Sequence, residues 1–366
     1  MAPRNRTSVH TQQAPIQLQM NAHKGPVGRD DRNLAIDVLR GFALLGILAA
    51  NIMLFDVDSF DVVEQSMDDL VIGISGAPFM VFTFVFVMNK MMAVFSMLFG
   101  AGVLLVTERI EARGESSLSV HYVRNLLLIG IGVAHSALWF GDILLIYGVS
   151  GLFLYPLRCL PAKALIGTGS ILWLLVVLVV TDVVVEYFLR APSMMLIGMG
   201  LYRLGAINAQ RDAAWYKKVM RRSFSVGLPL CAVALGFIEE QEKLALLINN
   251  LGVPFMALGY VCLVMRVCVE GKLPRVQARM AAAGQMALTN YLMQTVLGIL
   301  LIGIINGVRG ERVTAFLMMV VMLVIWAAQL TWSTLWLRTF RFGPFEWAWR
   351  SITYRRLQPF RKGAYH

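Results

Sequence analysis

The stretch from His135 to Tyr147 combines an imidazole and a carboxylate with two apolar segments. His135 lies six residues before the Gly141-Asp142 turn, about 9 Å along a helix, which predicts a position near the middle of a membrane. A neutral imidazole there can take a proton from a hydroxyl or an amine. We predict His135 as a catalytic base and Asp142, at the outer rim, as its orienting or charge-stabilising partner. Structural roles fit as well, since a lone His often links helices and an Asp at a turn often caps the next helix.

Asp37 and Arg40 open the first apolar segment and lie three residues apart, on one face of a helix. Asp37 falls in the first turn, where the helix dipole favours an anion. One interpretation is an interfacial ion pair, with Gly41 permitting close helix packing. The other is that Arg40 holds an anionic group such as a phosphate at the cytoplasmic mouth. Both residues are therefore candidates for ligand binding.

Four further polar residues interrupt or border apolar stretches and complete the candidate binding set: Asn51, Lys90, Asn290 and Glu346. Polar and ionisable groups inside a membrane are costly, so each is a functional candidate. Asn290 follows small residues at a helix start and also fits hydrogen bonding to a neighbouring helix. Glu346 lies in the aromatic, basic stretch 342–350, which also fits anchoring in the membrane interface. No residue set predicts a metal site.

The composition determines what kind of protein must position these residues. The chain has 366 residues, of which 58% are hydrophobic and 15% charged, whereas an ordinary soluble domain has about 25% charged residues. A membrane span needs about 20 mostly apolar residues. We therefore predict an all-α, polytopic membrane helical bundle. Its eleven apolar stretches are 34–55, 70–88, 90–107, 123–140, 143–160, 163–181, 190–207, 224–239, 245–268, 285–306 and 313–336.

Charge between these stretches predicts the topology. The net charge of +11 comes from short basic runs in the connections, as the positive-inside rule requires of cytoplasmic loops, and it does not indicate nucleic-acid binding. The predicted domains are a disordered cytoplasmic tail (1–33), a transmembrane domain (34–337) and a basic, aromatic cytoplasmic tail (338–366). Two cytoplasmic termini require an even number of crossings. We therefore expect about ten transmembrane helices and one re-entrant or interfacial segment near 70–107.

Several catalytic and ligand-binding motifs are absent from the sequence. It has no Walker A loop, no GxSxG elbow and no HExxH, which excludes ordinary ATPases, serine hydrolases and zinc proteases. Its four cysteines show no CxxC or CxxH spacing and lie in or beside apolar stretches, so they are predicted to be free thiols.

Four stretches resemble the YeiB family of bacterial membrane proteins, and the likeness extends in order from about residue 33 to 357. The stretches are 36–47, 95–102, 135–147, and a C-terminal part that joins 284–291 with 342–350. The resemblance implies a multi-pass protein of the bacterial inner membrane.

Through its Asp-x-x-Arg-Gly start, the family is similar to a wider group of transmembrane acyltransferases. This group includes the lysosomal heparan glucosaminide N-acetyltransferase and bacterial O-acyltransferases that act on cell-surface glycans. The likeness implies an acyl-CoA donor, with acetyl-CoA as the first choice, and a small-molecule or glycan acceptor outside the membrane. By this resemblance His135 is the base and Arg40 contacts the phosphates of the donor.

Two other functions fit the same residues. One is a small-molecule transporter or export partner that uses the polar cavity without acyl chemistry, although the sequence shows no inverted repeat of the kind common in transporters. The other is a non-catalytic membrane scaffold. The expected partners are the lipid bilayer, the acceptor and a second copy of the chain in a homodimer.

Overall fold

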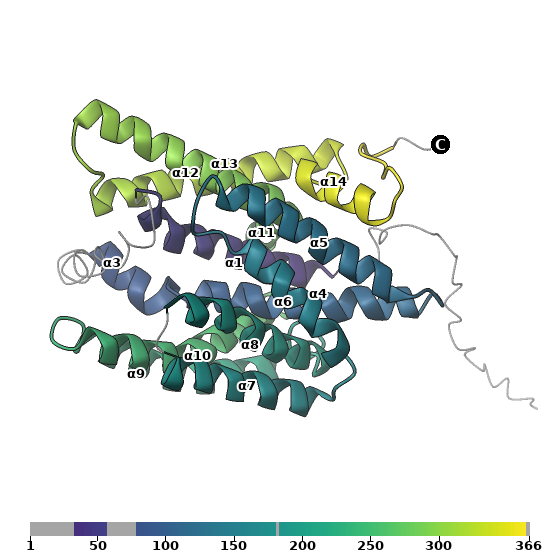
Figure 1. The fold of residues 1–366 in the computed structure, drawn as a ribbon, viewed down its shortest axis with the longest axis horizontal. Helices are drawn as coiled ribbons and strands as arrows, with labels where there is room; N and C mark the ends of the chain where they lie inside the picture. Colours follow the sequence, from purple (N-terminus) through teal and green to yellow (C-terminus); the bar gives the residue numbers. More distant parts are fainter. Residues whose placement is uncertain (1–32, 57–77, 181–182, 364–366) are drawn as a thin grey trace, which may run out of the picture.

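The computed structural model describes residues 33–56, 78–180 and 183–363. These residues form long helices that run along the long axis of the molecule, together with shorter helices such as α11 and α14 (Figure 1). The elements are α1 (Leu34–Asn51), η2 (Ile52–Leu54), α3 (Pro78–Phe82), η3 (Thr83–Val87), α4 (Lys90–Glu111), α5 (Ser117–Ser136), α6 (Leu144–Leu157), α7 (Ala162–Val179), α8 (Val183–Arg203), α9 (Ala213–Leu235), α10 (Glu242–Val269), α11 (Pro274–Gln285), α12 (Ala287–Arg309), α13 (Ala315–Thr339) and α14 (Pro344–Thr353).

The predicted all-α, polytopic bundle is confirmed, and the described ranges contain no strand. Seven helical segments are long and apolar enough to cross a membrane, and α6 is a shorter apolar helix. The seven segments are Leu34–Leu54, Pro78–Glu111, Ser117–Ser136, Ala162–Val179, Glu242–Val269, Ala287–Arg309 and Ala315–Thr339. The expected total of ten crossings remains a prediction.

Residues 78–111 form one broken helix where the sequence shows two apolar stretches. The π-helical turn η3 follows α3, and α4 begins after Asn89, whose φ of 61° lies in the left-handed region. This 34-residue unit is a single candidate span, in agreement with one crossing between 70 and 107. Residues 70–77, where the re-entrant or interfacial segment was also expected, lie outside the described residues.

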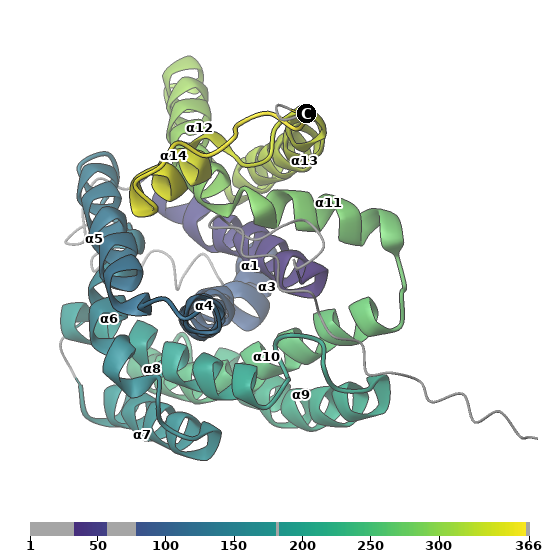
Figure 2. The same ribbon diagram turned by 90° about the vertical axis from the view of Figure 1, so that its right-hand side faces the viewer.

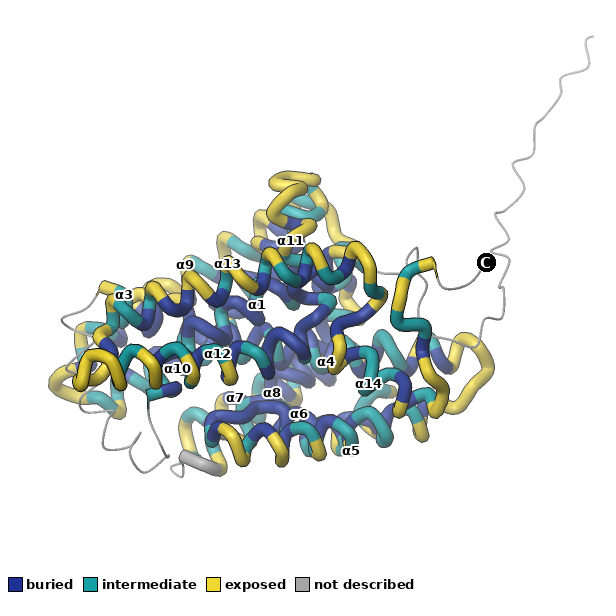
Figure 3. The backbone as a smooth tube through the Cα atoms, turned by 90° about the horizontal axis from the view of Figure 1, so that it is seen from above, coloured by how far each residue is buried: buried dark blue, intermediate teal, exposed yellow. Residues whose placement is uncertain are grey.

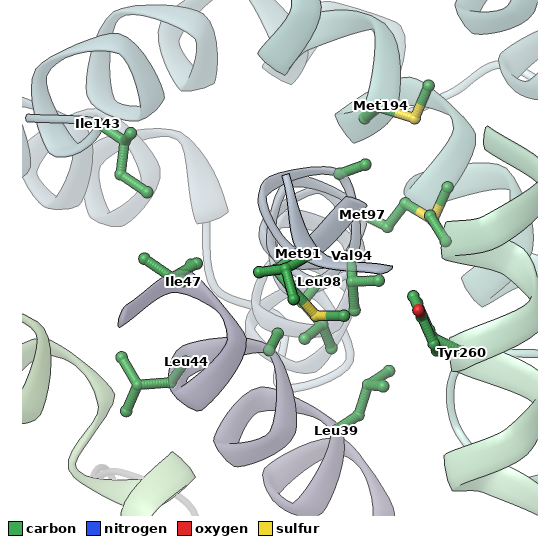
Figure 4. Packing of buried hydrophobic residues seen from close by; sticks show 14 of the residues in the cluster. Leu39, Leu44, Ile47, Met91, Val94, Met97, Leu98, Ile143, Met194 and Tyr260 are labelled. Atoms are coloured by element: carbon green, nitrogen blue, oxygen red, sulfur yellow. The ribbon is translucent and has the colours of Figure 1, made fainter. Parts of the chain in front are cut away.

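The core lies where α1 and α4 meet near the centre of the bundle, with α7 to α10 on one side and α12 to α14 on the other (Figure 2). Leu39 and Leu44 of α1 pack among Met91 and Val94 of α4 and Tyr260 of α10 (Figure 4). The inward helix faces are buried and the outward faces exposed, as a bundle surrounded by lipid requires (Figure 3).

Glycines bring α1 and α11 into backbone contact. A Cβ built on Gly41 would overlap the carbonyl oxygen of Met280, and one on Gly284 would overlap the carbonyl oxygen of Asp37. Small residues at such points allow helices to approach closely in a membrane. This contact fixes the first turns of α1 against the break between α11 and α12.

The start of α1, the helix connections at residues 112–116, 158–161, 204–212 and 270–273, and α14 all lie at one end of the bundle (Figure 1). We call this the basic end, because most of the arginines and lysines of the described chain are in or beside these segments. The predicted cytoplasmic segments therefore share one side.

Candidate active site

His135 and Asp142 form a buried pair between α5 and the start of α6. His135 Nδ1 lies 2.7 Å from Asp142 Oδ1, and the side chains are only 3% and 0% exposed. Asp142 Oδ2 accepts a hydrogen bond of 2.8 Å from the backbone N–H of Leu145. The carboxylate therefore orients the imidazole and caps α6 at the same time. Its contacts fit both the predicted partner of His135 and the predicted helix cap.

The pair lies deeper in the molecule than the sequence suggested for Asp142. Glycines draw α5 and α6 together, because a Cβ on Gly132 would overlap the backbone of Leu145. The 14 residues of α6 rise about 21 Å, which is less than the hydrocarbon thickness of about 30 Å. The α5–α6 turn consequently lies well short of the far end reached by α9, α12 and α13 (Figure 1). Asp142 is buried beside His135 and is not at an outer rim.

The second ring nitrogen of His135 is the chemically available atom of the pair. His135 Nε2 is buried and has no hydrogen-bond partner in the described structure, whereas buried polar atoms in proteins nearly always have one. A carboxylate at Nδ1 favours the tautomer that carries the proton on Nδ1 and leaves Nε2 as an acceptor. That arrangement can remove a proton from a hydroxyl or an amine placed against Nε2.

A cavity of about 280 Å³ leads from the basic end toward this pair. Its walls come from α1, α4, α5, α6, α11, α12 and α14, several of which surround the same region when the bundle is viewed from this end (Figure 2). The lining residues of α4 extend from Phe95 to Ile110, a rise of about 22 Å. Between these ends the wall is mostly apolar, with Leu98, Phe99 and Val103.

The mouth of the cavity is strongly cationic. Five arginines line it, against the two carboxylates Asp37 and Glu346; the arginines are Arg40, Arg109, Arg113, Arg124 and Arg350. Such a concentration of positive charge beside a low-dielectric wall attracts anions. Arginine also offers a planar set of donors suited to phosphate oxygens.

Two contacts hold parts of this mouth in place. Arg40 Nη1 lies 2.9 Å from Asp37 Oδ1, which confirms that the two residues share one helical face and shows the ion pair directly. The guanidinium of Arg124 lies 4.1 Å from the ring centroid of Trp349, and the indole N–H of Trp349 donates to the Arg124 carbonyl oxygen at 3.1 Å. Stacking on an aromatic ring fixes a guanidinium without neutralising its charge.

The cavity ends beside His135 without reaching it. Its deepest lining residues include Ile143 and Leu144, which follow Asp142 directly, and Tyr147 and Tyr291. The ring centroids of Tyr291 and His135 are 5.2 Å apart, and His135 does not line the cavity. The Tyr291 ring therefore lies next to both the cavity and the imidazole.

Glu346 lines the cavity and joins α14 to the start of α12. Its carboxylate accepts hydrogen bonds from the backbone N–H groups of Leu288 (2.6 Å) and Thr289 (3.0 Å) and from the Thr289 hydroxyl (2.6 Å). Burial raises the pKa of Glu346 above its usual value, while these donors oppose the shift. These bonds hold the C-terminal segment against the bundle. Within that segment, the Trp347 indole donates to the Gln358 carbonyl oxygen at 2.7 Å.

The structure does not bring three predicted binding residues to this cavity. Asn51 is the last residue of α1. Lys90 is fully buried, and its Nζ donates at 2.6 Å both to the Phe84 carbonyl oxygen and to Asn249 Oδ1. Asn290 donates to the Ala283 carbonyl oxygen and to Ser333 Oγ and accepts from the Trp332 indole, so it links α11, α12 and α13.

Four of the mouth arginines, Arg109, Arg113, Arg124 and Arg350, belong to the basic runs that the charge pattern predicts as cytoplasmic, and that pattern does not predict that they share one mouth. Arg109 lies in the last turn of α4 and Arg113 just beyond its end at Glu111; their closeness in the chain is the one local signal for the mouth. No local signal places Tyr291 beside His135, because α5 and α12 are distant in the chain.

Comparison with known proteins gives relatives along nearly the whole chain. Residues 201–356 match a family model described as protein of unknown function, DUF418. The chain is 31% identical to an uncharacterized 39.9 kDa protein of Bacillus acidopullulyticus, over 91% of this chain and 97% of the relative. It is 28% identical to the uncharacterized protein YeiB of Escherichia coli, over 90% and 98%, and 27% identical to the uncharacterized protein YxaH of Bacillus subtilis, over 92% and 98%. No solved structure matches the chain.

Proposed function

The chain belongs to the YeiB-like DUF418 family of proteins of unknown function, and on this premise we propose that it is a membrane acyltransferase. It transfers an acyl group from acyl-CoA, in the first place acetyl-CoA, to a hydroxyl or an amine on a small molecule or glycan. One observation carries the proposal: the buried His135–Asp142 pair, with its unpartnered Nε2, lies beside the closed end of a cavity with an arginine-lined mouth.

The charge of the mouth fits the donor. The phosphates of CoA would bind at Arg109, Arg113 and Arg124, and the pantetheine arm would follow the apolar wall toward Tyr291. The positive-inside rule assigns the basic end to the cytoplasm, where acyl-CoA is made. We place the protein in the bacterial inner (plasma) membrane, and the basic charge of the connections favours both termini on the cytoplasmic side.

The reaction follows from the geometry of the pair. His135 Nε2 takes the proton of the acceptor, and Asp142 stabilises the imidazolium that forms. The acceptor oxygen or nitrogen bonds to the acyl carbon, the carbon–sulfur bond breaks, and CoA leaves as a thiolate. The thiolate takes up the proton that His135 releases, which restores the neutral imidazole. Only the acyl group crosses the membrane, so the highly charged CoA remains on its own side.

The test uses inverted inner-membrane vesicles that contain the protein, with radiolabelled acetyl-CoA added outside, at the former cytoplasmic face. Label should enter membrane or lumenal acceptor in step with CoA release. His135→Gln, which preserves polarity and approximate size, should lower both rates at least a hundredfold, the usual scale of general base catalysis. Equal rates with a correctly inserted His135→Gln protein would refute the assignment of the base.

A transporter is the second candidate, because a cavity open at one end and closed at the other also fits one state of a carrier. Transport would move a solute without releasing CoA. Simultaneous measurement of CoA release and labelled product separates the two functions.

A further inference from the structure

The closed end of the cavity is formed by aromatic and aliphatic side chains. Along α12 the lining residues end at Tyr291, and along α5 they end at Leu128, seven residues or about 10 Å before His135. Tyr291 is 2% exposed, and its hydroxyl accepts a hydrogen bond of 3.3 Å from the Ile143 backbone N–H. Its ring is therefore held at the point where a thioester would have to meet the imidazole.

A second aromatic side chain, Trp139, also packs beside His135. The ring centroid of Trp139 lies 6.2 Å from that of His135 and 4.9 Å from that of Phe55. The Trp139 indole donates to the Leu54 carbonyl oxygen at 3.3 Å, and both Trp139 and Phe55 are buried. Close packing of these rings near His135 leaves little space for a chain that extends beyond the reacting carbonyl.

On the basis of the proposed transferase function, we infer that the Tyr291 ring limits the transferred acyl group to a short chain. During transfer the acceptor atom lies between His135 Nε2 and the acyl carbon, so the acyl carbon has to come close to the imidazole. The rest of the acyl group then lies against Tyr291 and Trp139, whose rings are next to that of His135. An acetyl group needs the smallest displacement of these rings. A longer chain would require Tyr291 to leave its position against Ile143.

The experiment compares CoA release from acetyl-CoA and octanoyl-CoA in the same vesicles, with His135→Gln as the background. The wild-type protein should use acetyl-CoA at least tenfold faster, in the range that steric discrimination of apolar groups gives. Tyr291→Ala should bring the two rates to within about threefold by removing the ring. Tyr291→Phe preserves the ring and should keep the wild-type preference; Tyr291→Leu replaces the Ala variant if that protein does not fold.

Equal use of both donors by the wild-type protein, or an unchanged preference in Tyr291→Ala and Tyr291→Leu, would overturn this inference while leaving the transferase intact. A wild-type protein that releases no CoA above the His135→Gln background from either donor would overturn the proposed function, and this inference with it. The two failures are thus distinguishable.

Discussion

Asp142→Asn separates the two functions of the Asp142 carboxylate. The asparagine oxygen can still accept from the Leu145 N–H, so the cap of α6 is retained. The amide nitrogen then faces His135 Nδ1, where the carboxylate oxygen lies 2.7 Å away in the native protein. An N–H facing Nδ1 makes that nitrogen an acceptor and moves the ring proton to Nε2, where the imidazole can no longer accept a proton.

The expected loss is large for activity and small for stability. In catalytic triads the same change lowers kcat by about 10⁴-fold through the wrong tautomer, and general base catalysis is worth about 10²–10⁴-fold. We therefore expect transfer from radiolabelled acetyl-CoA to fall about 10³-fold, equivalent to about 4 kcal/mol of activation free energy. The loss of a helix cap typically lowers the free energy of unfolding by about 1 kcal/mol. Because Asp142→Asn retains the cap, its free energy of unfolding should change by less than this.

Asp142→Ala is the matched comparison. It removes the cap as well as the orienting group, so its thermal unfolding should occur at a lower temperature than that of Asp142→Asn. Acetyl transfer and thermal unfolding of both purified variants provide the readouts. If Asp142→Asn transfers acetyl groups at the native rate and only Asp142→Ala is impaired through instability, Asp142 is a cap alone and the proposed pair is refuted.

Three further predictions test other parts of the structure. Replacing both Arg109 and Arg113 with Ala should weaken binding of radiolabelled CoA at least tenfold and reduce its salt dependence, because two cations leave the mouth; unchanged affinity would place the phosphates elsewhere. Lys90→Met should lower the free energy of unfolding by about 1–3 kcal/mol, by leaving two buried acceptors unpaired, yet leave CoA affinity unchanged; a specific loss of affinity would restore Lys90 to the binding site. Gly343→Ala should cost about 1 kcal/mol in thermal unfolding, because its Cβ would overlap the Glu346 carboxylate that caps α12, whereas Gly303→Ala, which meets nothing within 4 Å, should not destabilise.

The helical architecture and the local pairs could be predicted from the sequence because their signals are local. Apolar length predicts the spans, and spacing along one helix predicts the Asp37–Arg40 ion pair. His135 and Asp142 also lie on one short hairpin, so their proximity follows from the α5–α6 turn. Their depth did not follow, because it depends on the short length of α6 relative to its neighbours.

The remaining features depend on packing between helices that are distant in the chain. The charge of Lys90 fits anion binding, but its Nζ donates a hydrogen bond to Asn249 of α10. Lys90 therefore links α4 to α10 inside the bundle. The break at left-handed Asn89, in a segment already predicted to cross once, is linked to α10 by the hydrogen bond of 3.0 Å that Asn89 Nδ2 donates to Asn250 Oδ1. Tyr291 and the arginine mouth become part of one site only when α4, α5, α12 and α14 are assembled around the cavity. Neither the hydrophobic periodicity nor a short sequence motif predicts these contacts between distant helices.

The most direct measurement is an experimental structure of the protein with a non-hydrolysable thioether analogue of acetyl-CoA. We expect the phosphates of the analogue to contact arginines of the mouth and its acyl carbon to lie beside the displaced Tyr291 ring. A single acceptor atom, about 3–3.5 Å from that carbon, should then fit between it and His135 Nε2. An analogue bound outside the cavity, or bound with its acyl end directed away from His135, would contradict the account.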